Sequence, residues 1–291
     1  MFKIKKKIIY FIESILLSLL FIFLKILPLN LSSFLMGKLA SIVGPKLGIS
    51  KKAYNNIKYV MPEKNEEQSL QIIKGMWENL GKVFGEYPHL SKLDPEKNNK
   101  IEVCGKKNLE LIKKSKIPAI FFSGHIANWE ISPIAAIRND VPVLSIFREP
   151  NNPFVNFLIK YLRSNLPMAP KGKEGAKQLI RSLKKGTSIG LVIDQKMNDG
   201  ISVPFFGISA MTPSAIADLA LRFDCPIVPV HIERLAGVKF RVIFEPPLKV
   251  KKSGDQKENI YALMVQINDK IEEWIRARPE QWLWLHNRWS I

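Results

Sequence analysis

The sequence predicts an α/β protein with a single central sheet, mostly parallel or mixed, that is flanked by helices and preceded by an N-terminal membrane-anchoring helix. Three observations favour this fold class. A long apolar stretch opens the chain, short apolar runs then alternate with segments of helical periodicity, and polar residues directly follow several of these runs. Strands that alternate with helices are typical of a sheet covered on both faces, with functional residues in the loops at the strand ends.

The composition limits the class of protein and its partners. With 291 residues, 46% of them hydrophobic and 24% charged, the chain can bury a full core and is not a disordered tail protein. Two cysteines exclude a disulfide framework and a four-cysteine zinc site, and indicate a reducing compartment. The 44 Lys and Arg against 26 Asp and Glu give a net charge of +18, which indicates an anionic partner: nucleic acid, phospholipid headgroups or an acidic carrier protein.

Residues 8–29 form the apolar stretch, which as a helix would extend about 33 Å, roughly the hydrocarbon thickness of a bilayer. It is longer than the apolar region of a signal peptide and lacks a clear cleavage site. We therefore expect residues 1–30 to be a membrane anchor and residues 31–291 to be one folded domain. The stretch is preceded by cations suited to headgroup binding, namely Lys3, Lys5, Lys6 and Lys7.

The orientation of this anchor stays open. Read by the positive-inside tendency, the leading lysines would keep the N-terminus in the cytoplasm and export everything after a full crossing. Glu13 and Lys25 lie within the stretch, however, and also allow a helix that dips into one leaflet without crossing it.

The remaining elements follow from hydrophobic spacing. Apolar residues recur at intervals of three and four in residues 66–86, which predicts an amphipathic helix with one buried stripe. Short apolar runs predict strands over residues 117–123, 141–147, 188–194, 226–232 and 239–244. Helical periodicity predicts helices over residues 129–138, 154–164, 174–185 and 213–223.

His125 and Glu130 are the candidate catalytic residues, because the histidine follows a buried strand and the carboxylate comes five residues later. In a continuous helix the two side chains would diverge by about 140°. They can meet if residues 124–127 form a turn and the helix begins near Asn128. Glu130 would then fix the tautomer of the imidazole, which would accept a hydroxyl proton. The alternative is that the two residues form only an ordinary hydrogen-bonded loop contact.

No metal is expected, since the spacing of a zinc helix is absent.

Several segments resemble one known family, the late acyltransferases of lipid A biosynthesis, which belong to the acyltransferases with an H-x₄-D/E signature. The signature corresponds to Gly124-His125-Ile126-Ala127-Asn128-Trp129-Glu130. Residues 147–153, Phe147-Arg148-Glu149-Pro150-Asn151-Asn152-Pro153, resemble the second block of the family. Asp194-Gln195, Val203-Pro204-Phe205-Phe206-Gly207 and Thr212-Pro213 are similar to the third block, and Cys225-Pro226-Ile227-Val228-Pro229-Val230 to the fourth. Residues 278–289 also look like the C-terminus of this family. The resemblance therefore spans nearly the whole chain.

The resemblance implies transfer of a fatty acyl chain from acyl carrier protein to a hydroxyl of a glucosamine-based lipid A precursor. It implies that residues 31–291 are a catalytic domain on the cytoplasmic face of the bacterial inner membrane. The partners would be acyl carrier protein, an anionic glycolipid acceptor and membrane lipids, with no nucleic acid. Because a thioester is already activated, deprotonating the alcohol and steadying the oxyanion suffice, and we expect no cofactor and no acyl-enzyme.

The resemblance also suggests residues for binding. Arg148 follows a strand and is a candidate for binding a phosphate of the acceptor or the developing oxyanion, with a surface salt bridge to Glu149 or Asp140 as the alternative. Further substrate-binding candidates follow other predicted strands or lie in a loop near a glycine turn, where aromatic rings could wall the pocket: Asp194, Gln195, Phe205, Phe206 and Gly207.

Three alternatives stay open. Trp282, Trp284 and Trp289 suit a membrane interface or the rim of a lipid pocket, but suit burial in the core equally well. A glycerophospholipid or lysophospholipid acyltransferase could use the same two catalytic residues. A membrane-tethered nucleic-acid-binding protein would also fit the charge, although the basic residues are scattered and no nucleic-acid-binding motif is present.

Overall fold

The N-terminal part of the chain is helical. The structure is a computed structural model that describes residues 2–96, 99–250 and 254–289, with the backbone only of residues 2–6. The side chains of Lys3, Lys5 and Lys6 thus lie outside the described part. The first elements are α1 (Phe2–Ile26), α2 (Leu29–Val43), α3 (Ser50–Val60) and α4 (Glu66–Glu86), with 3₁₀ turns at Gly44–Lys46 and Tyr87–Lys92.

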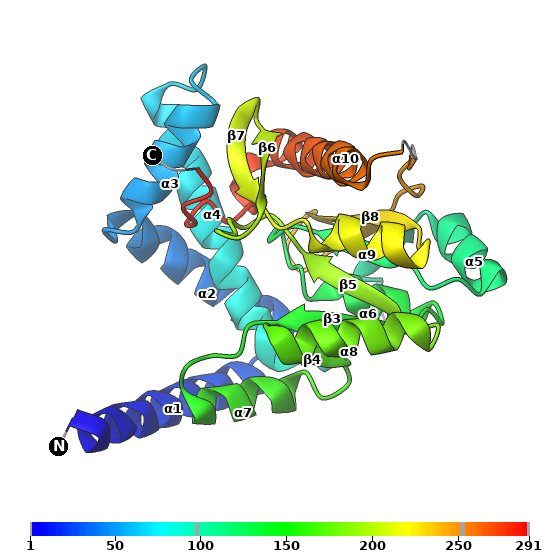
Figure 1. The fold of residues 1–291 in the computed structure, drawn as a ribbon. Coiled ribbons are helices and arrows are strands. Elements are labelled where there is room, and N and C mark those ends of the chain that lie inside the picture. The colour runs from blue at the N-terminus through cyan, green and yellow to red at the C-terminus, as the bar shows by residue number, and fades with distance from the viewer. Residues whose placement is uncertain (1, 97–98, 251–253, 290–291) are drawn as a thin grey trace.

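A seven-stranded sheet forms the centre of the rest (Figure 1). Its spatial order is β1-β9-β8-β2-β5-β3-β4, and every neighbouring pair is parallel except β8 with β9. The strands are β1 (Ile101–Cys104), β2 (Ile120–Ser123), β3 (Val143–Phe147), β4 (Met168–Pro170), β5 (Ser188–Val192), β8 (Ile227–Arg234) and β9 (Phe240–Phe244). A separate antiparallel hairpin joins β6 (Ile201–Phe205) to β7 (Ile208–Thr212).

Helices cover both faces of the sheet (Figure 1). They are α5 (Lys106–Ser115), α6 (Ile131–Arg138), α8 (Lys173–Lys184), α9 (Ala215–Phe223) and α10 (Gln256–Ala277), followed by a 3₁₀ turn at Pro279–Gln281. The remaining helix, α7 (Pro153–Leu162), lies beside α1. The expected fold class, a single mostly parallel sheet flanked by helices after an apolar N-terminal helix, is confirmed.

The helix predicted over residues 66–86 has those bounds in the structure. It begins with a capping box: the Asn65 side chain accepts from the Gln68 backbone N–H at 2.8 Å, and the Gln68 side chain accepts from the Asn65 N–H at 3.0 Å. Helices α2, α3, α5 and α10, strands β1 and β4 and the β6–β7 hairpin were not predicted. β4 has three residues, too few for a periodic signal, and residues 203–207 were interpreted as a loop although most of them belong to β6.

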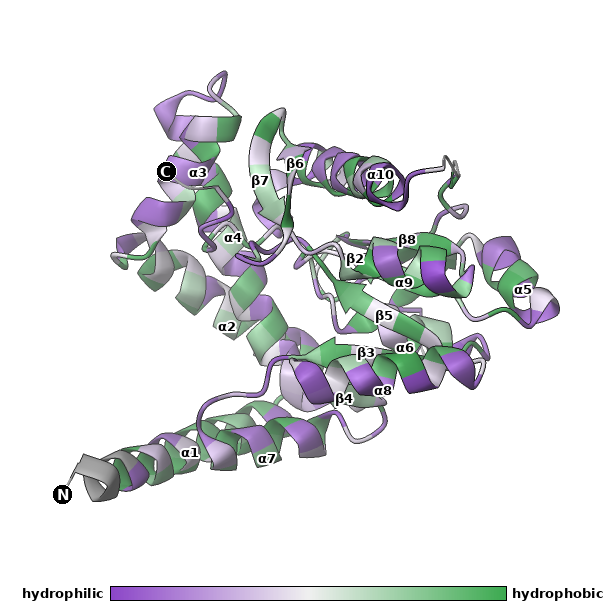
Figure 2. Cartoon of the chain, viewed as in Figure 1, coloured by the Kyte–Doolittle hydropathy of each residue, from purple (hydrophilic) through white to green (hydrophobic). Residues whose placement is uncertain are grey.

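Helix α1 projects away from the sheet with α7 alongside it (Figure 1), and both are largely apolar (Figure 2). Within the described residues, Lys7–Ile26 is the one helical segment long and apolar enough to cross a membrane, with a mean hydropathy of 2.2. Only 17% of that apolar window is buried within the protein, so its apolar surface is mostly uncovered.

Helices α2 and α4 pack with their backbones in close approach because glycines of α4 face α2. A Cβ atom on Gly81 would lie 2.3 Å from the Met36 carbonyl oxygen, and one on Gly85 would lie 2.5 Å from the Ser32 carbonyl oxygen. The Ser32 hydroxyl donates to the Gly85 carbonyl at 2.6 Å, which fixes this register. Since α4 also supplies residues to the site described below, this contact helps to position it.

Replacing Gly81 by alanine should therefore force α2 and α4 apart. We expect Gly81→Ala to lower the free energy of unfolding by about 1–3 kcal/mol, measured by denaturant unfolding in detergent. Gly48→Ala is the control, because a Cβ atom there would meet no atom within 4 Å. Equal stability of the two variants would contradict the close packing.

Candidate active site

Four neighbouring parallel strands bring polar residues to one edge of the sheet. Strands β2, β5, β3 and β4 lie side by side in that order and run in the same direction. The residues just beyond their carboxyl ends therefore share one edge, where α/β proteins usually bind ligands. These residues are His125 after β2, Asp194 and Gln195 after β5, Arg148 after β3 and Lys171 after β4.

His125 lies in a tight turn that the rest of the protein holds in place. Ala127 has a positive φ of 51°, which is uncommon for a residue with a side chain. Its N–H donates to the Gln281 carbonyl at 2.9 Å, and its carbonyl accepts from the Asn79 side chain at 3.0 Å. The Leu283 N–H donates to the His125 carbonyl at 3.1 Å. The predicted turn before a helix is present, with α6 beginning at Ile131.

Asp194 fixes the imidazole of His125. One oxygen of the Asp194 carboxylate lies 2.8 Å from Nδ1 of His125, and the other accepts from the His125 backbone N–H at 2.8 Å and from the Trp282 indole N–H at 2.6 Å. Burial alone would raise the pKa of Asp194, but the charge of His125 and these hydrogen bonds outweigh it and lower the pKa to about 2.

The ionised Asp194 determines which nitrogen of His125 carries the proton. A carboxylate can only accept hydrogen bonds, so Nδ1 of His125 must be the donor. In the neutral ring, Nε2 then keeps its lone pair. The His125 side chain is 21% exposed, whereas that of Asp194 is 1% exposed. The ring therefore combines a fixed tautomer with an accessible basic nitrogen, which is the arrangement that a general base requires.

The expected hydrogen bond between Glu130 and the His125 ring is not found among the described residues, and Glu130 instead forms an ion pair with Arg163. Both partners are largely buried, with side-chain exposures of 5% and 11%. The Arg163 guanidinium also lies over the rings of Tyr87 and Phe147, at 5.3 and 5.4 Å from their centres. A buried guanidinium needs a counter-charge, which explains why Glu130 turns toward it.

Gln195 links two histidines. Its amide nitrogen lies 2.7 Å from Nε2 of His286 and 3.3 Å from both ring nitrogens of His125. Burial, and then the nearby His125, lower the pKa of His286, so at neutral pH its ring is neutral and can accept a hydrogen bond from the amide. His286 thus belongs to the site.

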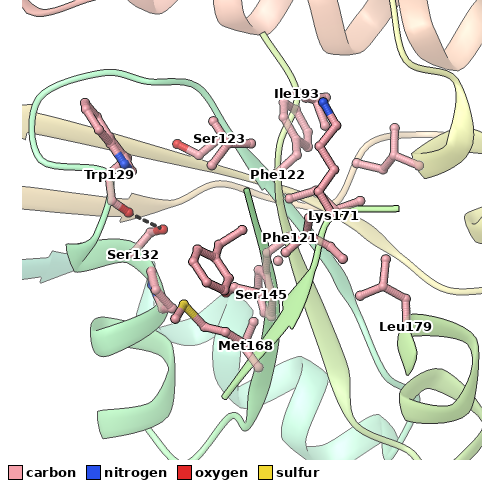
Figure 3. Close-up of a pocket in the computed structure, with 18 of the residues that line it drawn as sticks. Phe121, Phe122, Ser123, Trp129, Ser132, Ser145, Met168, Lys171, Leu179 and Ile193 are labelled. Atoms are coloured by element: carbon pink, nitrogen blue, oxygen red, sulfur yellow. Dashed lines mark hydrogen bonds between the residues drawn. The ribbon is translucent and has the colours of Figure 1, made fainter. Parts of the chain in front are cut away.

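A cavity of about 700 Å³ opens beside His125. Figure 3 shows side chains from several strands and helices around it, among them Phe121, Ser145, Met168 and Leu179. Its inner part is apolar, with Phe121, Phe122, Val143, Leu179, Leu191 and Ile216. Cations predominate among its charged lining residues, namely Arg148, Arg163, Lys171, Lys173 and Lys196, against the single carboxylate of Glu130. This combination suits a ligand with a long apolar chain and an anionic group.

Arg148 lines the cavity and is exposed, and it forms no hydrogen bond or ion pair with any residue that the structure describes. The neighbouring acids considered as its partners are bound elsewhere. Glu149 pairs with Lys160 at 2.5 Å and Asp140 with Lys113 at 2.9 Å. The guanidinium is therefore available to an anion.

The described residues include no group of three or more His, Cys, Asp or Glu that could hold a metal ion.

Phe205, Phe206 and Gly207 do not line this cavity. Phe206 and Gly207, with φ of 57° and 70°, form the two-residue turn between β6 and β7. The Phe205 ring stacks on Trp289 with 5.5 Å between ring centres, and the Phe206 ring lies against the same tryptophan at 5.9 Å. The structure thus places these three residues in a hairpin that packs on the C-terminal segment, away from this cavity.

Trp282, Trp284 and Trp289 are all buried, with at most 2% of their surface exposed. In the structure these tryptophans are buried in the core and do not lie at a membrane interface or at the rim of the cavity. Trp282 also forms an isolated antiparallel bridge with Ile126 in the histidine turn. The C-terminal segment therefore forms one wall of the site.

A buried ion pair supports the histidine turn from the other side. The Arg234 guanidinium donates to both carboxylate oxygens of Glu86 on α4, at 2.5 and 3.0 Å, and to the side-chain oxygen of Asn79 at 2.8 Å. Asn128, which follows the turn, donates to Glu86 at 2.8 Å. Arg234 is 5% exposed and Glu86 is fully buried, so each of these buried charges needs the other as its counter-charge.

Comparison with known proteins identifies the family. The family model of the bacterial lipid A biosynthesis acyltransferases matches residues 2–290. The chain belongs to this family.

Two relatives from Escherichia coli (strain K12) have related names. The chain is 24% identical over 249 residues to a lipid A biosynthesis lauroyltransferase, covering 83% of this chain and 79% of the relative. It is 21% identical over 271 residues to a lipid A biosynthesis palmitoleoyltransferase, covering 91% and 86%. Among solved structures, the crystal structure of a 1-acyl-sn-glycerophosphate acyltransferase from Thermotoga maritima has a TM-score of 0.37 and 14% identity, covering 87% of this chain and 95% of that one.

Several residues and contacts of this candidate site were not predicted from the sequence. Asp194 was identified as a binding residue, but its contact with His125 was not predicted. The contact follows from the strand register, because Ser123 pairs with Val192 and the two site residues each lie two positions further on. Arg163 gave no signal, since it lies 33 positions from Glu130 at the end of a helix. Glu86 and Arg234, 148 positions apart, were likewise not recognisable.

The buried pair Glu86–Arg234 should contribute strongly to the stability of this acyltransferase. We expect Arg234→Met to lower the free energy of unfolding by about 3–5 kcal/mol, because it leaves the Glu86 carboxylate buried without its cation. The double variant Glu86→Gln with Arg234→Met should recover part of that loss in the same denaturant titration. A double variant less stable than Arg234→Met would contradict the pairing.

Proposed function

We propose that the protein transfers a fatty acyl chain from acyl carrier protein to a hydroxyl of an anionic lipid A precursor, with His125 as general base. The observation that carries the proposal is the position of His125, with its basic nitrogen fixed at a cavity that is apolar inside and bears five cations in its lining. Membership of the family supports acyl transfer in lipid A biosynthesis. Donor, acceptor group and mechanism are our proposal.

The chemistry begins with proton transfer. Nε2 of His125 accepts the proton of the acceptor hydroxyl while the oxygen attacks the thioester carbonyl carbon. The imidazolium that results is stabilised by the ionised Asp194, which is held 2.8 Å from Nδ1. When the tetrahedral intermediate collapses, the carbon–sulfur bond breaks and the proton passes from Nε2 to the departing thiol. The products are an ester and free acyl carrier protein, and no acyl-enzyme forms. A general base of this kind contributes about 10²–10⁴ in rate.

The cavity supports a fatty acyl chain and an anionic acceptor. Its inner residues offer an apolar surface for the chain, and the names of the Escherichia coli relatives, a lauroyltransferase and a palmitoleoyltransferase, agree with an acyl donor. Arg148, exposed and without a partner among the described residues, is placed to bind a phosphate of the acceptor. Lys171 and Lys173 add positive charge beside it, which also suits an acidic carrier protein.

We further propose that the protein lies on the cytoplasmic face of the bacterial inner membrane. The apolar helix α1 supports membrane attachment. Because acyl carrier protein is a cytosolic donor, the catalytic domain must lie on the cytoplasmic side.

A transfer assay tests this function. Membranes that contain the protein should move a radiolabelled acyl group from acyl carrier protein to a lipid A precursor, and His125→Ala should abolish the transfer. Lysophosphatidic acid serves as a parallel acceptor, and turnover on it alone would favour a glycerolipid acyltransferase. Binding of oligonucleotides without any acyl transfer would support the nucleic-acid-binding alternative.

The two carboxylates of the site should act in different ways. Asp194→Asn should lower kcat by about 10²–10⁴, because it no longer fixes the tautomer of His125 or stabilises the imidazolium. Glu130→Gln should also lower activity, but through Arg163, whose guanidinium would be left buried without a counter-charge. The double variant Glu130→Gln with Arg163→Met should then lose no more activity than the more damaging single variant.

The same set of variants tests the simpler dyad of His125 with Glu130. If Glu130 orients the ring directly, the loss of activity in Glu130→Gln should add fully to the loss in Arg163→Met. It should then show no additivity with the loss in Asp194→Asn. Steady-state kinetics of the single and double variants distinguish the two arrangements, and that second pattern would contradict the role of Asp194.

A further inference from the structure

We infer that α1 and α7 together form one membrane-binding surface that lies along the interface of a single bilayer leaflet, so that α1 does not cross the membrane. This inference goes beyond the proposed function, which requires attachment but not its geometry. It rests on the aromatic face of α7, the contacts that tie α7 to α1, and the ion pair between Lys160 of α7 and Glu149.

Helix α7 presents an uncovered aromatic face. Eight of its ten residues are apolar, yet none of the ten is buried. Phe154, Phe157 and Tyr161 are 50%, 75% and 70% exposed. Their spacing of three and four places them on one side of the helix. A helix of only ten residues gains little stability by itself in water, so an apolar face of this kind needs a covering partner.

Helix α7 is fixed to α1 at its first turn. The Asn152 side chain donates to the Tyr10 carbonyl at 2.8 Å and to the Glu13 carboxylate at 3.2 Å. Its oxygen caps α7 by accepting from the Phe154 N–H at 3.1 Å. The Phe154 ring also meets the Phe11 ring edge-on, with 6.0 Å between centres. Glu13, a polar interruption in the apolar segment, is thus a partner of α7.

The two helices stay together along the segment. At the other end of α7, Arg163 lies over the Tyr87 ring, and Tyr87 in turn stacks on Phe21 of α1 with 6.2 Å between ring centres. Figure 1 shows α7 running beside α1 between these two points. About half of the candidate span is therefore flanked by α7, whose ten residues extend about 15 Å.

An ion pair at α7 makes a straight crossing of the bilayer by α1 costly. Lys160 of α7 pairs with Glu149, with 52% and 39% of their side chains exposed. If α1 crossed the bilayer in this arrangement, this pair and Asn156 would enter the hydrocarbon, where ionised groups are costly. When both helices lie in the interface, the pair can stay in water while the aromatic face meets lipid, the environment that aromatic side chains favour.

A bilayer is the occupant that fits this surface. The outer side of α1 continues the apolar face, with Leu16 and Leu19 63% and 59% exposed. Facing the protein are the buried residues Ser14, Phe21 and Leu24. Attachment to one leaflet also keeps the domain on the same side as the N-terminus, which removes the conflict between the leading lysines and a cytoplasmic domain. Arg163, at the end of α7, lines the cavity, so the cavity lies close to the lipid surface.

Spin labels can measure the depth of both helices. Single cysteines replace Ile8, Leu16, Phe23 and Phe157 in the full chain with Cys104→Ser, while the buried Cys225 is retained. The labelled proteins are bound to vesicles of phosphatidylethanolamine and phosphatidylglycerol, and the access of oxygen and of a water-soluble nickel complex gives the depth. Leu111→Cys is the control, because Leu111 is 61% exposed on α5, at the far end of the sheet.

We expect shallow and similar depths at the three α1 positions and at Phe157, and an aqueous signal at position 111. Depths that reach the bilayer centre near Leu16 and return to the surface at both ends would overturn the inference. So would an aqueous signal at Phe157. Each labelled variant is also assayed for acyl transfer, so that failure of this geometry is distinguished from failure of the proposed function.

A pair of substitutions gives an independent measure. Phe157→Asp should weaken binding to the same vesicles about tenfold or more, because it removes an aromatic side chain from the lipid and places a charge there. Leu111→Asp should leave vesicle binding unchanged. Equal binding of Phe157→Asp and Leu111→Asp would contradict lipid contact by α7.

Discussion

The carboxylate of Asp194 is the group on which the geometry of this site depends. It accepts hydrogen bonds from the backbone and the ring of His125 and from the indole of Trp282, and it is nearly inaccessible to water. With the pKa lowered to about 2, it stays ionised at any physiological pH. A single buried charge thus fixes the place of the histidine, the tautomer of its ring and the approach of the C-terminal segment.

Parts of the chain remote from the cavity contribute by holding the histidine turn. The backbone of residues 281–283 bonds to both sides of the turn, and the β6–β7 hairpin packs Phe205 against Trp289. The ion pair of Glu86 with Arg234 fixes the turn from α4 through Asn128. A general base works only when it is held in place, and here three distant segments supply that support.

Local patterns predicted most of the fold, and long-range contacts account for most of the differences. Periodicity identified α4, and apolar runs identified β2, β3 and β5, which His125, Arg148 and Asp194 follow. His125 and Asp194 were both recognised, because polar residues after parallel strands meet at one edge. Their pairing was missed since Glu130 is nearer in sequence, and the partner of Glu130, Arg163, comes from a helix end that no local pattern connects to it. Phe205 illustrates a different error, because a loop was expected at residues 203–207 and a β-hairpin forms there.

The tautomer of His125 tests this account most directly. In protein labelled with ¹⁵N at histidine, nitrogen NMR of the neutral ring distinguishes the protonated nitrogen from the one with a lone pair, and His125→Gln identifies the signal. We expect a proton on Nδ1 and a lone pair on Nε2, with Asp194→Asn disturbing this state and Glu130→Gln preserving it. A neutral ring with its proton on Nε2, unaffected by Asp194→Asn, would contradict it.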